Sequence, residues 1–266
     1  MAQKKCLISI CNLGYNDKLR NSFWSLKDAS NELKSDYDFV REVVRENGMH
    51  FEFVCDEFKK DRSLALLAVT QNGLVLEFVD EELKIDPEII EIALQQNCLA
   101  LQFVGSKYVI NHETALSLVK QNGLVLKLLN EQYKDNFDLV LEAVKQNGLS
   151  LEFASDKLKE NKEIILASVT QNGMALEFAS KTFKDNNEIV TMAIMQNGLS
   201  LQFASKQLKS DLSTALYAVR QNGRSLQFTS GELQNNLEII AEAIAQTDWA
   251  KLFIGEQLRN SNVLYR

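Results

Sequence analysis

The sequence has few of the residues that build small catalytic or metal centres. Its 266 residues include four cysteines and two histidines. The cysteines, at positions 6, 11, 55 and 98, lack the two-residue spacing of zinc and redox sites. A Cys/His metal site is therefore disfavoured, and we expect free thiols in a reducing compartment.

Long apolar runs are also lacking. No stretch approaches the ~20 apolar residues that a membrane-spanning helix needs. The chain has a basic start followed by an apolar run, but that run ends at Asn12, so it makes a poor signal peptide. We expect a soluble, cytosolic protein without membrane insertion.

Positive charge is in deficit. The chain has 29 basic and 36 acidic residues, which gives a net charge of −7. This charge repels nucleic-acid phosphates and anionic membrane surfaces alike. General nucleic-acid binding is therefore disfavoured.

What the sequence does have is a repeat of 25 residues, marked by the tripeptide Gln-Asn-Gly. A fixed period of this length is typical of stacked-repeat proteins. Residues 1–21 do not fit the phase, and we interpret them as a non-repetitive lead-in to a solenoid over residues 22–266. The central position of the tripeptide falls at Asn47, Asn72, Asn97, Asn122, Asn147, Asn172, Asn197 and Asn222, with Thr247 closing the series.

Each unit is predicted to begin with an α-helix. Its first position holds a strong N-cap residue, whose side-chain oxygen accepts a first-turn N–H. The only proline, Pro87, comes one residue after such a cap, where proline is tolerated. The apolar positions form one stripe on a 3.6-residue helix, and the third member is usually small, which allows close stacking. The caps are Asp36, Asp61, Asp86, Asn111, Asn136, Asn161, Asn186, Asp211 and Asn236.

The Gln-Asn-Gly tripeptide is predicted to end the helix, with its glycine in the left-handed conformation of a Schellman motif. Two units depart from the pattern, with Cys98 and Asp248 in place of glycine. The apolar residues that follow are spaced for a second helix rather than a strand. Polar residues at core positions, Asp28 and Lys251, predict polar end caps. The fold class expected is an all-α solenoid of about nine 25-residue two-helix repeats.

The repeat unit is similar to the repeat of a known family. The unit from Asn161 to Ser180, with its Gln171-Asn172-Gly173 tripeptide, resembles the repeat called domain of unknown function forty-one-sixteen, over residues 22–260. The family has no established activity or catalytic residues to carry over. Because its members include effectors of intracellular bacterial pathogens, the resemblance implies a secreted effector, or a modulator of one, in a host cytosol.

No catalytic arrangement emerges from the sequence. His50 and His112 lie at different phases of the repeat, without an acid and a nucleophile at a matching phase. We expect surface histidines, no enzymatic activity, no cofactor and no small-molecule substrate. An enzyme with an unrecognised site remains an alternative.

Two polar rows have alternative interpretations. A glutamine recurs once per unit beside the apolar stripe, where it would either hydrogen-bond between repeats or line a groove for an extended peptide. A lysine also recurs once per unit, and one contact per repeat is a known way to read RNA. The aromatic residues that would stack on bases are predicted to be in the core, so solvated lysines are favoured over RNA binding. The lysines are Lys34, Lys59, Lys84, Lys134, Lys159, Lys184 and Lys209.

The best candidate for binding is an exposed helical position that turns apolar in some units. This position holds Leu67, Ile92, Met192 and Tyr217 in four units, whereas other units have Glu or Ser there. At a second outward position, Met195 replaces a residue that is polar in other units. Methionine and tyrosine on adjacent units are typical of a protein contact surface. We therefore expect a non-enzymatic interaction scaffold whose partner is a host protein or a fellow effector.

Overall fold

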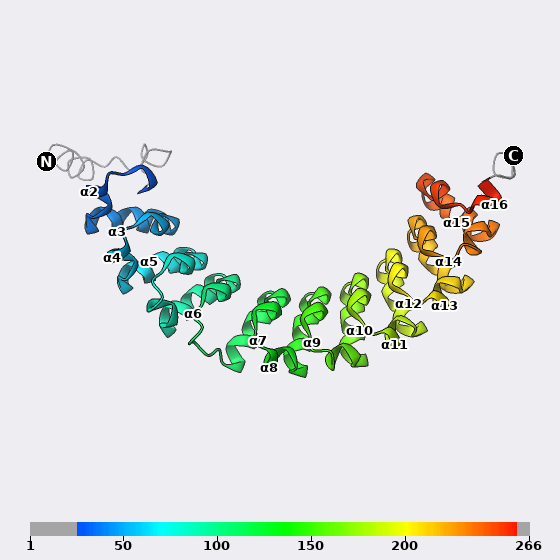
Figure 1. Ribbon diagram of the computed structural model, residues 1–266, viewed down its shortest axis with the longest axis horizontal. Coiled ribbons are helices and arrows are strands. Elements are labelled where there is room, and N and C mark those ends of the chain that lie inside the picture. Colours follow the sequence, from blue (N-terminus) through cyan, green and yellow to red (C-terminus); the bar gives the residue numbers. More distant parts are fainter. Residues whose placement is uncertain (1–25, 260–266) are drawn as a thin grey trace. The chain divides into compact units, whose positions relative to one another are not determined.

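The computed structural model describes residues 26–259, and all of its regular elements are helical (Figure 1). The all-α repeat fold is therefore confirmed. The predicted lead-in, residues 1–21, lies outside the described residues. The chain divides into two compact units, residues 1–109 and 110–266.

The first unit contains three ten-residue α-helices, each followed by a six-residue 3₁₀-helix and, in two of the three repeats, by a shorter helical segment. In the described part of the chain, residues 104–111 after the third repeat form no helix. The elements of the first unit are η1 (Leu26–Asp28), α2 (Asn31–Lys34), α3 (Tyr37–Glu46), η2 (Gly48–Phe53), α4 (Asp56–Lys59), α5 (Arg62–Gln71), η3 (Gly73–Phe78), η4 (Leu83–Ile85), α6 (Pro87–Gln96) and η5 (Cys98–Phe103).

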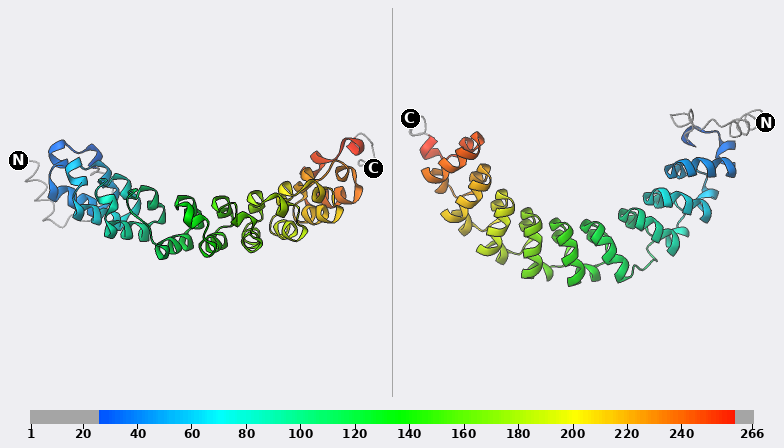
Figure 2. Two further views of the ribbon diagram at one scale, coloured as in Figure 1. Left: turned by 60° about the horizontal axis from the view of Figure 1, so that its bottom comes forward. Right: turned by 180° about the vertical axis from the view of Figure 1, so that it is seen from behind.

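The second unit continues the same order of elements. Its ten-residue helices form one row, and short helices such as α8, α11 and α13 lie along one side of that row (Figures 1 and 2). Its elements are α7 (His112–Gln121), η6 (Gly123–Leu128), α8 (Glu131–Lys134), α9 (Phe137–Gln146), η7 (Gly148–Phe153), η8 (Leu158–Glu160), α10 (Lys162–Gln171), η9 (Gly173–Phe178), α11 (Lys181–Lys184), α12 (Asn187–Gln196), η10 (Gly198–Phe203), α13 (Lys206–Ser210), α14 (Leu212–Gln221), η11 (Gly223–Phe228), η12 (Leu233–Asn235), α15 (Leu237–Gln246), η13 (Asp248–Phe253) and α16 (Glu256–Arg259).

The ten-residue helices begin where the sequence predicts. Asp61, for example, accepts a hydrogen bond from the Leu64 N–H at 2.7 Å, and Asp86 caps a helix whose first residue is Pro87. Such caps satisfy N–H groups that have no partner within the helix. The predicted second helix consists of a 3₁₀-helix followed by a short helical segment.

The ends of these helices differ from the prediction. The C-cap is the asparagine, which is extended at Asn72 with φ −148° and ψ 108°. The Asn72 side chain then accepts the Leu74 N–H at 3.0 Å, and so it caps the following 3₁₀-helix. The glycine after it does not adopt the left-handed conformation. The Schellman prediction is wrong, because the asparagine both ends one helix and starts the next.

The glycine is required by the stacking of repeats. A Cβ atom at Gly73 would lie 2.2 Å from the Ala93 carbonyl oxygen in the next repeat, and a Cβ at Gly173 would lie 2.2 Å from that of Ala193. Only glycine allows this approach. The two exceptions, Cys98 and Asp248, stand in the last described repeat of each unit.

The core of each unit is a stack of similar layers. The four stripe positions of each ten-residue helix are mostly buried, and so is one leucine in most of the six-residue 3₁₀-helices; at that position η2 has the buried Phe51 and η13 has Lys251. The recurring phenylalanines, such as Phe153 and Phe178, are half-buried, which corrects their placement in the core. At the C-terminal end Lys251 is exposed, but Trp249 and Leu252 beside it are 64% and 59% exposed. This cap is therefore not uniformly polar. The side chain of Asp28 lies outside what the structure describes.

Candidate protein-binding surface

The glutamine row links successive repeats. In six pairs the glutamine Oε1 accepts the N–H of the glycine 23 residues earlier, at 2.6–2.7 Å. The Nε2 group of Gln96 also donates to the Gln71 carbonyl at 3.1 Å. Since both ends of the amide are engaged, the interpretation as an inter-repeat link is favoured over a peptide groove. The pairs are Gly48–Gln71, Gly73–Gln96, Gly123–Gln146, Gly148–Gln171, Gly173–Gln196 and Gly198–Gln221.

The lysine row takes part in a second link between repeats. The backbone carbonyl of Lys134 accepts the Ser155 N–H at 2.9 Å, and that of Lys184 accepts the Ser205 N–H at 2.8 Å. Such bonds tie the short segments together, while the glutamines tie the helix ends. Neighbouring repeats that have both links are thus joined on two sides.

The lysine amines have local partners as well. Lys184 donates to the Glu177 carbonyl at 2.6 Å, Lys209 to the Gln202 carbonyl at 2.6 Å, and Lys34 to the Lys27 carbonyl at 3.0 Å. Burial lowers the pKa of Lys209. The other four amines pair with a carboxylate three residues earlier: Lys59–Asp56, Lys84–Glu81, Lys134–Glu131 and Lys159–Asp156.

The two histidines belong to different units. His50 lies in the first unit, where burial lowers its pKa, and His112 lies in the second, 6.3 Å from the Tyr133 ring. Burial raises the pKa of the Cys98 thiol, which disfavours the reactive thiolate. Among residues 26–259, no group of three or more His, Cys, Asp or Glu side chains could hold a metal ion. No helix in that range is long and apolar enough to cross a membrane.

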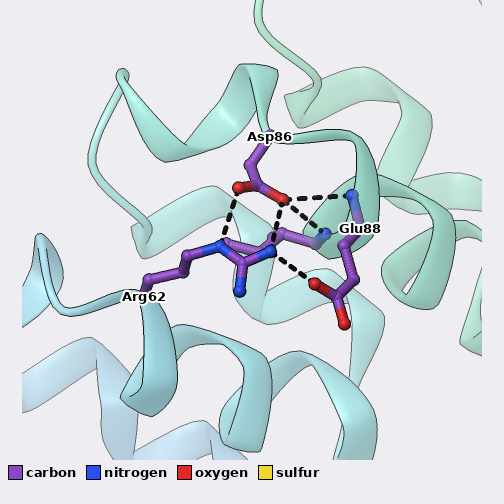
Figure 3. A network of polar contacts seen from close by, with 4 residues as sticks. Arg62, Asp86 and Glu88 are labelled. Atoms are coloured by element: carbon purple, nitrogen blue, oxygen red, sulfur yellow. Dashed lines mark hydrogen bonds and ion pairs between the residues drawn. The ribbon is translucent and has the colours of Figure 1, made fainter.

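Ion pairs join the surface of neighbouring repeats. In the first unit the Arg62 guanidinium contacts Asp86 at 2.9 Å and also pairs with Glu88 (Figure 3). The hydrogen bond from Arg62 lowers the pKa of Asp86. In the second unit Lys162 contacts Glu188 at 2.7 Å in the same way. Because these ion pairs are exposed, each adds little to the stability of the fold. They align oppositely charged side chains of neighbouring repeats.

The structure places two of the five candidate residues in the first unit. Leu67 lies on α5 and Ile92 on α6, which pack against each other. Both side chains are half-buried. They occupy the same position of adjacent repeats, but the neighbouring position changes from Leu66 to Glu91, so this surface is not continuously apolar.

The other three candidates come together in the second unit. Met192 and Met195 lie on α12 and Tyr217 lies on α14, and these two helices pack side by side. Met195 is 66% and Tyr217 57% exposed, while Met192 is half-buried. Large apolar side chains so exposed on adjacent helices suit protein contact.

Sequence reasoning missed three apolar neighbours of these residues. Leu166, Ala167 and Leu216 are half-buried at the same level of the helix row. Leu166 and Ala167 line a shallow groove that reaches Leu141 on α9. The signal for Leu166 and Leu216 was the fifth helical position, which is leucine in several units, whereas Ala167 occupies the sixth position, the one that holds Met192 and Tyr217. We call the combined surface on α10, α12 and α14 the apolar band: Leu166, Ala167, Met192, Met195, Leu216 and Tyr217.

Charged residues frame the apolar band. On α9 Glu142 pairs with Lys145 at 3.2 Å, and beyond α14 Glu242 pairs with Arg220 at 2.9 Å. These glutamates occupy the repeat position that Met192 and Tyr217 occupy within the band. At this repeat position the apolar residues of the second unit are therefore limited to three successive repeats, Ala167, Met192 and Tyr217.

Comparison with known proteins identifies the repeat. The model of the family described as Domain of unknown function (DUF4116) matches residues 17–59, 61–108, 111–159 and 161–209. The matched segments cover most of the chain, which therefore belongs to this family of helical repeat proteins. No curated protein and no solved structure matches the chain.

Proposed function

We propose that the chain is a non-enzymatic scaffold that binds another protein through the apolar band. The observation that carries this proposal is the exposure of Met195 and Tyr217 on packed helices of a unit whose other outer helical positions are mostly polar. Methionine adapts to different partners, and tyrosine is frequent among residues that dominate binding energy.

The proposed setting is a host cell. The resemblance of the repeat to a family with members among bacterial effectors supports an effector, or a protein that modulates one, and the partner would be a host protein or a fellow effector. RNA binding is less well supported, because the lysine amines have protein partners. An enzyme is less well supported, because His50 and His112 lie at different phases of the repeat, without an acid and a nucleophile at a matching phase.

A pull-down from bacterial and host-cell lysates, identified by mass spectrometry, tests the proposal. The native chain is compared with a Met192→Glu, Met195→Glu, Tyr217→Glu triple variant. A matched control, Leu67→Glu with Ile92→Glu, alters the same repeat position in the first unit. Circular dichroism verifies that all chains are folded.

We expect a stoichiometric protein that is captured by the native chain and the control and is lost from the triple variant. Loss from the control alone would move the binding site to the first unit. Retention by all three chains would exclude both surfaces, and no captured protein at all would contradict the scaffold function.

A further inference from the structure

One of the seven Asn-Gly pairs that mark the repeats differs from the others in its hydrogen bonding. We propose that this pair, Asn222-Gly223, is a site of spontaneous deamidation, at which Asn222 is converted to aspartate or isoaspartate. The glutamine row protects the other six asparagines from the same reaction. The inference concerns a covalent modification of the chain and is independent of the proposed binding function.

The reaction uses only the chain itself and water. The Gly223 amide nitrogen gives up its proton to the solvent and attacks the Asn222 Cγ; glycine favours this attack because it has no side chain beside the nitrogen. An N–Cγ bond forms, the Cγ–Nδ2 bond breaks, and the Nδ2 nitrogen takes up a proton and leaves as ammonia. One water then opens the cyclic imide at either of its carbonyls. The net change is one water consumed and one ammonia released.

The seven asparagines start from the same conformation. Their ψ angles lie between 108° and 110°. Ring closure places the glycine nitrogen on the same side of the Cα–C bond as Cβ, so each asparagine must rotate far from this ψ. Each side chain also accepts the N–H two residues further on, at 3.0–3.1 Å. These obstacles are common to all seven pairs and do not distinguish Asn222.

The pairs differ in the partner of the glycine N–H. In six of them it donates to a glutamine Oε1 of the next repeat at 2.6–2.7 Å. Both the loss of the proton and the rotation of the asparagine would break that bond. The Gly223 N–H has no hydrogen-bond partner within residues 26–259, although Gln246 occupies the equivalent position. At Gly223 the reaction therefore breaks no link between repeats.

The residue that follows the glycine also differs. It is Leu or Met in the six linked pairs, whereas the exposed Arg224 follows Gly223. A positive charge near the amide favours the anionic nitrogen that attacks. Both the free N–H and this charge favour reaction at Asn222.

The product would alter the contact between two repeats. Asn222 ends α14, and α14 packs against α15. Aspartate could still cap η11, but isoaspartate adds one carbon to the main chain just before Gly223. A Cβ on that glycine would lie 2.4 Å from the Ala243 carbonyl oxygen, so the approach of the two repeats leaves little room for a longer chain. Isoaspartate at position 222 is therefore expected to loosen the packing of α14 on α15.

Peptide mapping by mass spectrometry tests the inference, since one sample contains all seven pairs. The full native chain is incubated in mildly alkaline buffer, with and without guanidinium chloride. Three variants are treated in the same way: Gln196→Ala removes the acceptor of the Gly173 N–H, Gln246→Ala changes the equivalent glutamine at Gly223, and Ile189→Val disturbs the core of α12 without touching the link. Circular dichroism verifies that the chains are folded.

In the native chain we expect Asn222 to react about tenfold faster than each of the other six, the factor that corresponds to one hydrogen bond. In denaturant the seven rates should become similar. Gln196→Ala should accelerate Asn172 by a similar factor and Ile189→Val should not, while Gln246→Ala should leave the rate at Asn222 unchanged.

The native chain alone can overturn the inference, whether or not the variants fold. Asn47 closes the first described ten-residue helix and is linked, so equal rates at Asn47 and Asn222 would show that the link gives no protection. A preference for Asn222 that persists in denaturant would assign it to Arg224 alone. Absence of reaction at Asn222 would exclude the site, and equal acceleration of Asn172 by Gln196→Ala and Ile189→Val would exclude the protective role of the glutamine.

Discussion

The Gly173 N–H donates a hydrogen bond to the Gln196 Oε1 of the next repeat at 2.7 Å, at a point where a Cβ on Gly173 would lie 2.2 Å from the Ala193 carbonyl oxygen. One glycine thus provides both the donor and the space for the contact between repeats. The tripeptide that defines the period of the sequence is the tripeptide that holds the repeats together.

Substitution of this glycine tests its role. We expect Gly173→Ala to lower the free energy of unfolding by about 1–3 kcal/mol, because the added methyl group must displace the backbone of the next helix. Gly231 is the matched control, since a Cβ there meets nothing within 4 Å, and Gly231→Ala should change stability by no more than about 1 kcal/mol. Urea denaturation followed by circular dichroism measures both. Equal effects would contradict the close-approach explanation.

The glutamine link is tested by two neighbouring residues of α6. Gln96 bonds both the Gly73 N–H and the Gln71 carbonyl, whereas Gln95 contacts Glu91 within its own helix at 3.3 Å. We expect Gln96→Ala to cost about 1–3 kcal/mol, because it leaves a partly buried N–H without a partner. Gln95→Ala should cost less than about 0.5 kcal/mol. Similar losses from both variants would show that the row is not structural.

Acid sensitivity of the first unit follows from Asp86. Its pKa lies below the ordinary value because Arg62 and two N–H groups of α6 donate to its carboxylate. A lowered pKa stabilises the fold fully above the ordinary value of about 3.9, and this stabilisation is lost as the pH falls through the folded pKa. Between pH 5 and pH 2, the native chain should lose more stability than Asp86→Asn, whose neutral cap occurs in other repeats. An equal loss would contradict the assignment.

How far the sequence could predict this structure depends on the range of each interaction. The N-caps, such as Asp61 and Asn161, act within one turn, so they placed the helix starts correctly. The role of Gly73 was assigned wrongly, because its reason lies in a carbonyl of the next repeat, 20 residues away. The division into two units was not predicted, because residues 104–111 keep the 25-residue phase although they form no helix.

The candidate surface was only partly visible in the sequence. Met192, Met195 and Tyr217 stood out because they replace polar residues at an exposed position. Leu166 and Leu216 did not, because leucine is frequent at their position and its half-burial follows from the packing of successive helices.

The lysine row gives a prediction about RNA. Since its amines bond nearby carbonyls and carboxylates, we expect no binding of single-stranded RNA at physiological salt. Gln234 occupies the same repeat position and donates to the Leu226 carbonyl at 3.2 Å, so Lys159→Gln and Lys184→Gln should leave the fold intact. Filter binding over a range of salt concentrations measures the affinity. Binding that weakens steeply with salt and disappears in these variants would contradict the prediction.

The most direct test of the scaffold function places a photo-crosslinking amino acid at position 195, in the apolar band, and at position 95, the same repeat position of α6 in the first unit. Both variant chains are expressed in host cells. The cells are irradiated, and their proteins are resolved by denaturing electrophoresis. We expect a discrete adduct from position 195 that disappears when Met192 and Tyr217 are both changed to Glu, and no adduct from position 95. An adduct from position 95 alone, or none from position 195, would contradict it.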